Sequence, residues 1–296
     1  MKIKLKSLLE RIVREDATDD KLSDLSDKFD NGSIEDYVSD LQKYLTDPKV
    51  VAVIKAGQTD GDPGDEKLSA GETSIAAKEL KPTQNEIGAE ESLKNILTDK
   101  YGSLDGFLRG KASFPTPVIT YNGKFVIDGH HRWSQVYAAN PDAEVPVLDI
   151  KGNLEPEQIL KAVHAAIAAT AGKTDTRDAN LAAGNLLAFN EQNVRDMVST
   201  FLTDKAREVW AAYGFDSDEQ IADHIVTNVN TMLAKSKPPE WAPERSSMPQ
   251  PEDSGAPNFA DALKSGAANY INPAASDAKT ESIDKSRWAK LANIKK

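Results

Sequence analysis

Hydrophobic residues near the start of the chain recur with the period of an α-helix. Within residues 1–14 they fall at i, i+3, i+4, i+7 and i+8, and basic residues surround them. This pattern predicts a docked amphipathic helix, with a targeting or partner-binding helix as the alternative. Two short polar helices are predicted in residues 18–46, the second of them capped by Ser33. The hydrophobic positions of the first helix are Leu5, Leu8, Leu9, Ile12 and Val13.

The next two segments differ in character. Residues 49–56, KVVAVIKA, are rich in valine, which favours a strand. Glycine and aspartate dominate residues 57–72, which predicts an acidic linker. Asp60, Asp62 and Asp65 have part of the spacing of a calcium loop, but a glycine precedes Asp65 where the calcium pattern has one after it. A solvated acidic loop is therefore the better interpretation.

Residues 73–151 have the pattern of a compact α/β unit. Hydrophobic segments predict four strands, and Asn122-Gly123 between the second and the third is a strong signal for a tight hairpin. Helical spacing predicts three helices, the last of which begins near His130. The predicted strands are residues 75–80, 117–121, 124–127 and 145–150, and the other two helices are residues 90–98 and 104–108.

The rest of the chain is predicted to be helical and then extended. Helical periodicity covers residues 154–234, where Asp216 with Glu219 resembles a capping box for the last helix. The end of the chain is rich in Pro, Ala and Ser, which predicts a tail with little core of its own. The expected fold class is therefore α+β, with an N-terminal helical segment at 1–56, a linker at 57–72, an α/β domain at 73–151, a helical domain at 152–234 and an extended tail at 235–296.

Composition narrows the classes of function. The chain has 296 residues, a net charge of −11 and no apolar run long enough to span a membrane. It has no cysteine, which excludes disulfides, thiolate nucleophiles and Cys-ligated zinc, and fits a reducing, cytoplasmic compartment. Residues 73–151 carry 9 basic and 10 acidic residues, so most of the acidity lies elsewhere. No large basic face is expected, and any contact with nucleic acid is expected to be local.

Candidate chemistry is concentrated in Asp128-Gly129-His130-His131-Arg132. A predicted strand ends here and a helix begins, so the free amides of the first helical turn lie beside these side chains. Such a corner suits an anion, above all a phosphate group. Several titratable groups crowded at one corner cost free energy unless a ligand uses them.

The residue types at this corner suggest separate roles. Gly129 and Arg132 are expected phosphate ligands, through close approach of the backbone and a bidentate guanidinium group. His130 and His131 are catalytic candidates as acid/base groups. Asp128 is a catalytic candidate that orients a histidine or holds Mg²⁺ or Mn²⁺.

Together with the upstream Lys81-Pro82-Thr83-Gln84, this corner resembles the ParB/sulfiredoxin-like superfamily, which includes the ParB-like nuclease domain. Members pair a Pro-x-Gln box with a later Gly-x-x-Arg corner at the start of a helix. The resemblance covers residues 73–151 and implies a small mixed α/β domain with a phosphate site for a nucleotide or nucleic acid. The missing cysteine excludes sulfiredoxin chemistry, and His130-His131 stand where partition proteins carry Glu-Arg.

The resemblance also implies roles for the upstream box. Thr83 and Gln84 would line the wall opposite the corner, and Lys81 would add positive charge. Glu86 follows the box and is a candidate catalytic base, with a solvated carboxylate at a helix start as the alternative. All of these residues would then face one nucleotide-binding or phosphate-binding cleft.

Two classes of function follow. The first is a ParB-like protein that binds a phosphate-bearing ligand, with nuclease, nucleotide hydrolase or phosphotransferase activity. The alternative is a structural, virion-associated protein of a tailed phage, attached to or packaged in the particle. In that case the N-terminal helix and the C-terminal tail would bind protein partners, in a homo-oligomer or a larger assembly. A weaker third hypothesis is an inhibitor of a host enzyme.

Overall fold

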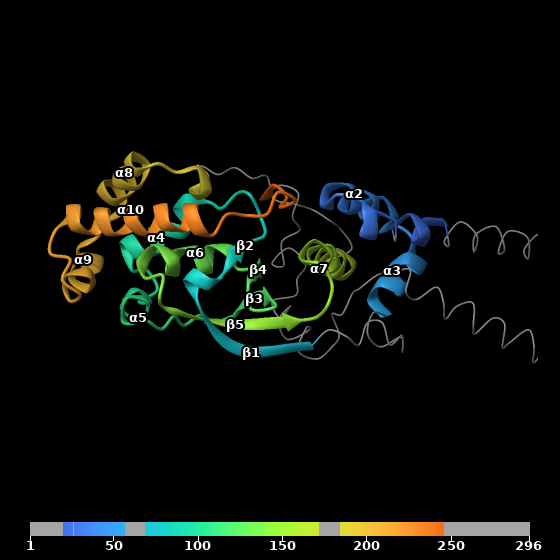
Figure 1. Cartoon of the computed structure of the whole chain (residues 1–296), viewed down its shortest axis with the longest axis horizontal. Coiled ribbons are helices and arrows are strands. Elements are labelled where there is room, and N and C mark those ends of the chain that lie inside the picture. Colours follow the sequence, from blue (N-terminus) through green and yellow to red (C-terminus); the bar gives the residue numbers. More distant parts are fainter. Residues whose placement is uncertain (1–19, 26, 57–68, 172–183, 246–296) are drawn as a thin grey trace, which may run out of the picture. The chain divides into compact units, whose positions relative to one another are not determined.

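The computed structural model describes residues 20–25, 27–56, 69–171 and 184–245 (Figure 1). The fold is mixed α+β, and the chain divides into two compact units, each described here by itself. The helix expected in residues 1–14, the segment 57–68 of the expected linker and the chain beyond residue 245 lie outside the described residues. Within the ranges that are described, no helix has the length and hydropathy needed to cross a bilayer.

The first unit is helical. It contains helical residues 20–25 and 27–31, followed by α2 (Ile34–Tyr44), α3 (Pro48–Ala56) and α7 (Pro156–Ala171). Ser33 caps α2 as predicted, because its hydroxyl accepts a hydrogen bond from the Asp36 amide. The hydrophobic side of α2 is buried where this helix packs against α7. These contacts join segments that are distant in the sequence.

The strand predicted for residues 49–56 is wrong, since these residues form α3. The helix begins at Pro48, whose missing amide costs nothing in the first turn. The Asp47 carboxylate accepts a hydrogen bond from the Lys49 amide at 2.9 Å, as a capping residue does. This start signal outweighs the strand preference of the valines.

A buried lysine links α7 to the helix that ends near residue 31. Lys161 is 2% exposed, and its ammonium group donates to the carbonyl oxygens of Phe29 and Gly32 at 3.0 and 2.6 Å. It also forms an ion pair with Glu157 at 3.3 Å. A cation at the C-terminal end of a helix satisfies carbonyl groups that have no partner within the helix.

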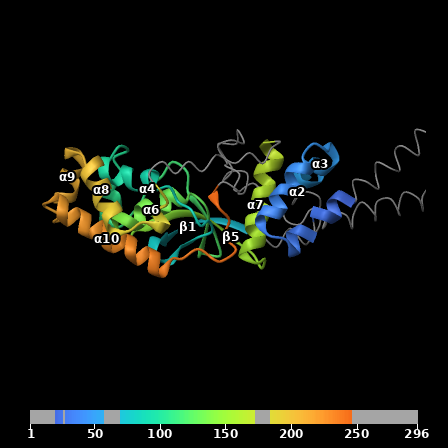
Figure 2. The same ribbon diagram turned by 90° about the horizontal axis from the view of Figure 1, so that it is seen from above.

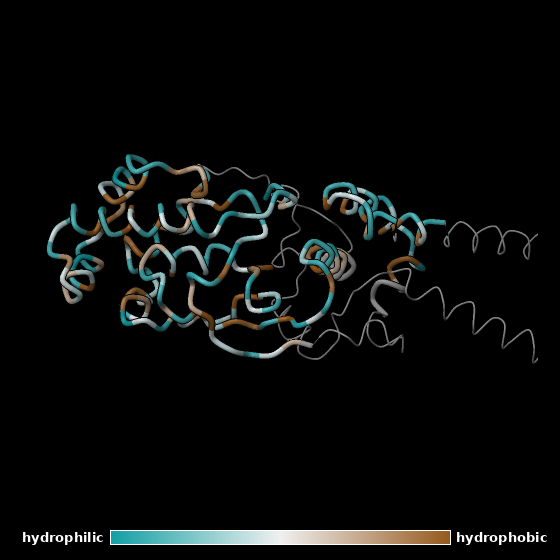
Figure 3. Tube along the Cα trace, viewed as in Figure 1, coloured by the Kyte–Doolittle hydropathy of each residue, from teal (hydrophilic) through white to brown (hydrophobic). Residues whose placement is uncertain are grey.

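The second unit contains a five-stranded mixed sheet with the order β1-β5-β3-β4-β2. The pairs β1/β5 and β3/β4 are antiparallel, whereas β5/β3 and β4/β2 are parallel. Figure 3 shows that the inner strand β5 is mostly hydrophobic, while its neighbour β1 at the edge is mostly hydrophilic or neutral. The strands are β1 (Ser69–Ala76), β2 (Lys81–Pro82), β3 (Val118–Tyr121), β4 (Phe125–Asp128) and β5 (Glu144–Lys151).

The hairpin and the last three strands lie close to their predicted positions, but the first strand does not. The strand expected at residues 75–80 begins earlier, because β1 starts at Ser69 inside the expected linker, and it ends at Ala76, where a short 3-10 helix, η3 (Ala77–Glu79), follows. The chain then crosses to the other edge of the sheet, where β2 pairs with β4. This crossing places residues 81–84 beside the end of β4.

Helix α6 lies at the centre of the second unit. It packs against β3 and β4, and α4 and α10 pack against it (Figures 1 and 2). The Trp133 side chain of α6 is fully buried, and its indole N–H donates to the Ala77 carbonyl oxygen at 2.9 Å. The helices are α4 (Ala89–Thr98), α5 (Leu104–Arg109), α6 (His130–Ala139), η4 (Leu186–Ala188), α8 (Glu191–Phe201), α9 (Asp204–Ala211) and α10 (Asp218–Lys235).

The predicted division into an α/β domain and a separate helical domain is not the one observed. Helices α8 to α10 share one hydrophobic core with the sheet and α6, whereas α7 belongs to the first unit. Trp210, Ile225 and Met232 are buried in this common core. The capping box of α10 also lies one residue later than predicted, with Ser217 and Gln220 as its members.

The beginning of the predicted tail also packs on the second unit. Ser236 and Ala242 are buried, and the Pro243 carbonyl oxygen accepts a hydrogen bond from the Asn85 amide at 3.0 Å. Residues 236–245, here called the C-terminal segment, therefore have a defined place. They bring residue 245 close to the predicted corner.

The hairpin turn generates a stability prediction. Asn122 and Gly123 both have positive φ angles, of 50° and 67°, which suits a tight turn between β3 and β4. A Cβ atom on Gly123 meets no atom closer than 3.7 Å, so Gly123→Ala adds backbone strain without a clash. We expect it to lower the free energy of unfolding by about 1–2 kcal/mol in urea titrations.

Gly71→Ala is the matched control for that variant. Gly71 lies in the edge strand β1, its φ is not positive, and an added Cβ has no neighbour within 4 Å. The control is expected to change stability little or to raise it slightly. Equal stabilities for the two variants would contradict the assigned turn geometry.

Candidate functional site

The predicted corner lies where β4 ends and α6 begins. Gly129 is the residue before the helix, with φ of 90°, and no side chain caps the helix there. The Trp133 amide bonds to the Gly129 carbonyl oxygen at 2.9 Å, so the amides of the three preceding residues have no partner within the helix. The positive end of the α6 dipole is directed at the same place.

Arg132 folds back over this helix start. A Cβ atom on Gly129 would lie 2.7 Å from Nη2 of Arg132, so the guanidinium group occupies the space that a side chain would need. Nη2 forms an ion pair with the Asp128 carboxylate at 2.9 Å and a long hydrogen bond of 3.4 Å to the Pro117 carbonyl oxygen. The buried Nε of Arg132 has no hydrogen-bond partner in the described part of the chain. Gly129 is thus required both for its backbone angle and for the position of Arg132.

His130 joins the corner to the upstream box. It is 5% exposed, and its Nε2 accepts a hydrogen bond from the Thr83 amide at 3.1 Å. The Thr83 hydroxyl donates to the Val126 carbonyl oxygen in β4 at 2.6 Å. Burial lowers the pKa of His130 well below 6.5, and the neighbouring cationic groups lower it further. His130 is therefore a neutral hydrogen-bond acceptor at neutral pH.

His131 makes a similar link to the start of α4. Its Nε2 accepts a hydrogen bond from the Gly88 amide at 3.2 Å, which places its ring proton on Nδ1. Burial, followed by the charges of Arg245 and Arg132, lowers the pKa of His131 to about 3. Both histidines thus bind backbone amides of the segment that follows β2.

Arg245 is a site residue that the sequence analysis missed. Its Nη1 lies 3.3 Å from Nε2 of His131, and its backbone amide donates to the Glu86 carboxylate at 3.2 Å. Arg245 comes from the C-terminal segment, which was expected to be a solvated tail. No local pattern distinguishes this arginine, because its position depends on how residues 236–245 pack.

The remaining predicted residues surround this corner to different degrees. Gln84 is 3% exposed, and its Nε2 is a buried donor for which the described residues offer no acceptor. Glu86 is half-buried and bonded to the Arg245 amide. The Lys81 backbone belongs to β2, and its side chain forms no hydrogen bond or ion pair with the described residues of the corner. The structure therefore brings together Thr83, Gln84, Glu86, Asp128, Gly129, His130, His131 and Arg132, and adds Arg245.

A metal site is not formed by the described residues. No three Asp, Glu or His side chains among them lie close enough together to hold a metal ion. Asp128, the candidate ligand for Mg²⁺ or Mn²⁺, is paired with Arg132. A metal bound here would have to take further ligands from water or from a bound phosphate group, and its presence stays a prediction.

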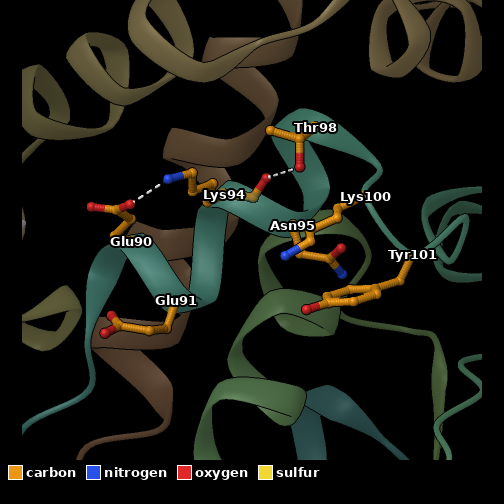
Figure 4. Close-up of a pocket in the computed structure, with 7 residues that line it drawn as sticks. All are labelled: Glu90, Glu91, Lys94, Asn95, Thr98, Lys100 and Tyr101. Carbon is orange, nitrogen blue, oxygen red and sulfur yellow. Dashed lines mark hydrogen bonds and ion pairs between the residues drawn. The ribbon is translucent and has the colours of Figure 1, made fainter.

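A second feature, a pocket of about 530 Å³, runs along α4. Figure 4 shows its side chains on α4 and the following loop, with the Tyr101 ring beside Asn95. Two carboxylates, Glu90 and Glu91, are balanced by the ammonium groups of Lys94 and Lys100. Lys94 already pairs with Glu90 at 2.5 Å, so this pocket suits an anion less well than the corner of α6 does.

Comparison with known proteins adds no relative: no family model matches the chain, and no curated protein or solved structure matches it. The function must therefore be inferred from the corner itself.

The lowered pKa of His131 generates a prediction about acid stability. Its pKa in the unfolded chain is about 6.5, so below that pH the unfolded state binds a proton that the folded state excludes until about pH 3. The contribution is fully present above pH 6.5 and is lost as the pH falls through this window. Near pH 5 we expect this group to lower the free energy of unfolding by about 2 kcal/mol relative to pH 8.

His131→Gln is the variant that tests this. An amide oxygen replaces Nε2 as the acceptor for the Gly88 amide, but it does not titrate in this range. Urea titrations at several pH values should give a shallower loss of stability for His131→Gln than for the wild type. His130 and His164 also have lowered pKa values, so some pH dependence remains. An unchanged slope would contradict the assigned role.

Proposed function

We propose that the protein binds a phosphate-bearing ligand, either a nucleotide or the phosphorylated end of a nucleic acid strand, at the start of α6. One observation carries the proposal: Gln84 Nε2 and Arg132 Nε are buried donors with no acceptor among the described residues. Nearly all buried polar groups in proteins have a hydrogen-bond partner, and each one left unpaired costs about 1–3 kcal/mol. Phosphate oxygens accept several hydrogen bonds and would satisfy such donors.

The electrostatics of the corner support an anionic ligand. The positive end of α6, the guanidinium group of Arg132 and that of Arg245 converge on it. Both histidines are neutral, so they neither repel a metal nor hold an anion by charge. Because the whole chain carries −11, long duplex DNA is a poorer ligand than a small phosphate or a strand end.

The arrangement also supports the resemblance to the ParB/sulfiredoxin-like superfamily. Residues 82–84 of the box are bonded to the Gly-x-x-Arg corner through Thr83 and His130, although they lie far apart in the sequence. Contact between these two motifs is what the resemblance leads us to expect. Helices α8 to α10 and the C-terminal segment would then be additions around the ParB-like part.

Binding is better supported than catalysis. Asp128, His130, His131 and Glu86, the four catalytic candidates, are each engaged with another group of the protein. A histidine that accepts an amide hydrogen bond must give it up before it takes a proton from a substrate. We therefore propose ligand binding ahead of nuclease, nucleotide hydrolase or phosphotransferase activity with Mg²⁺ or Mn²⁺, which can be assayed once a ligand is identified.

Because the four catalytic candidates are already bonded to other groups of the protein, a second candidate function is favoured. It is an assembly or structural role, such as that of a virion-associated protein of a tailed phage. The Asp128–Arg132 ion pair neutralises the corner from within, as expected where the fold is kept for its shape. In that case the protein would bind other protein chains through its surface and would not respond to phosphate compounds.

Arg132 provides the test of phosphate binding. The probes are the four ribonucleoside triphosphates, inorganic phosphate and a short single-stranded oligonucleotide with a 5′-phosphate, each measured by calorimetry with and without Mg²⁺. A charged hydrogen bond is worth about 1.5–3 kcal/mol, so Arg132→Ala should weaken binding by roughly 10-fold to 100-fold. Arg132→Lys should retain part of the affinity.

Arg109→Ala is the control, because it removes the same charge from an exposed site on α5 that pairs with Asp105. It should leave binding unchanged. If the wild type binds none of the probes, the phosphate-binding proposal is wrong, and oligomeric state and partner binding become the measurements of interest.

A further inference from the structure

We propose that Arg245, contributed by the C-terminal segment, is a second guanidinium group that binds the phosphate-bearing ligand at the start of α6. This inference rests on the proposed function and extends the site beyond the segment that resembles a known superfamily. It assigns a ligand-binding role to a residue that lies more than a hundred positions from the corner in the sequence.

The backbone around Arg245 is held in place beside the corner. Its amide donates to the Glu86 carboxylate at 3.2 Å, and two residues earlier the Pro243 carbonyl oxygen accepts from the Asn85 amide at 3.0 Å. Residues 85 and 86 directly follow the Pro-x-Gln box. The C-terminal segment is therefore fixed to the same stretch of chain that lines the candidate site.

Among the described residues no carboxylate pairs with the guanidinium group of Arg245, which distinguishes it from the other described arginines. Arg109, Arg132, Arg195 and Arg207 each form an ion pair with one or two carboxylates. Within the described part of the chain, the guanidinium group of Arg245 has a single hydrogen-bond partner, Nε2 of His131. A half-buried guanidinium group with no carboxylate partner among the described residues is costly, and a bound anion would balance its charge.

The contact with His131 does not by itself explain Arg245. The same nitrogen already accepts a hydrogen bond from the Gly88 amide at 3.2 Å, and it carries one lone pair. The 3.3 Å contact with Arg245 therefore adds little and is easily exchanged for a phosphate oxygen. Arg245 is held near the corner by its backbone while its side chain keeps unused donors.

Arg132 and Arg245 approach the start of α6 from different sides. Arg132 lies with Asp128 and the Pro117 carbonyl oxygen, on the side of β3 and β4. Arg245 lies with His131 and the Gly88 amide, on the side of α4. A phosphate group seated on the first-turn amides between them would receive donors from both sides. Ligand binding would thus also tie the C-terminal segment more firmly to the corner.

Arg245→Gln is the decisive variant. Glutamine keeps a donor for Nε2 of His131 and removes the positive charge. With the probes named above, we expect Arg245→Gln to weaken binding by about tenfold or more and to lower the dependence of affinity on salt concentration. Arg245→Lys, which keeps the charge without the planar fork, should lie between Arg245→Gln and the wild type.

Stability measurements separate this role from a structural one. If Arg245 only holds the C-terminal segment, Arg245→Gln and Arg245→Lys should lower the unfolding midpoint to a similar extent and leave affinity unchanged. Arg109→Ala again serves as the control for the removal of one positive charge. Proteolysis by chymotrypsin, which cuts after aromatic residues such as Trp241 of the C-terminal segment, adds a second readout, since bound ligand should slow this cleavage in the wild type and not in Arg245→Gln.

The outcomes distinguish the two proposals. Binding by the wild type that Arg245→Gln leaves unaltered overturns the role of Arg245 and leaves the proposed function standing. Binding by the wild type that both Arg132→Ala and Arg245→Gln weaken supports both. A wild type that binds no probe overturns both, and the unbalanced charge of Arg245 is then a feature of an interaction surface.

Discussion

The geometry of the candidate site depends on two hydrogen bonds from backbone amides to imidazole nitrogens. The Thr83 amide donates to His130 and the Gly88 amide to His131, so consecutive residues of one helix hold both ends of the segment after β2. Each bond requires a neutral ring, and burial supplies that condition by lowering the pKa of both histidines. Protonation of either ring would break its hydrogen bond, so the low pKa values of the two histidines preserve the geometry of the corner. Every other feature of the candidate site is placed relative to this arrangement.

Local features of the site could be predicted from the sequence because their physical causes are local. Asn122-Gly123 specifies a turn through positive φ angles, and the helix that follows Gly129 begins where the strand pattern ends. The grouping of Asp128 to Arg132 followed directly from their adjacency. The contact between the box and the corner came from a resemblance, and the Thr83–His130 hydrogen bond shows its geometry.

The errors have the opposite origin, because they concern long-range packing. Residues 49–56 look like a strand by composition, but Asp47 and Pro48 begin a helix that packs against α7. Helices α8 to α10 were expected to form a separate domain, because the amphipathic pattern of a helix does not specify which surface its hydrophobic side covers. The position of Arg245 could not be predicted for the same reason, since it depends on where the segment after α10 packs.

The pairing of β1 with β5 has a consequence for how the chain folds. Ser69 lies opposite Lys151, so the first strand of the sheet pairs with the last one in the sequence. Among the described strands, β5 is the only neighbour of β1. During synthesis β1 emerges long before that neighbour exists, and loop-closure entropy delays such distant pairing. The sequence of β1, SAGETSIA, contains few large apolar residues, which limits self-association of this strand before β5 has been synthesised. The β3–β4 hairpin and the start of α6 need no such distant pairing, so the corner at Gly129 is expected to take shape before the sheet that supports it is complete.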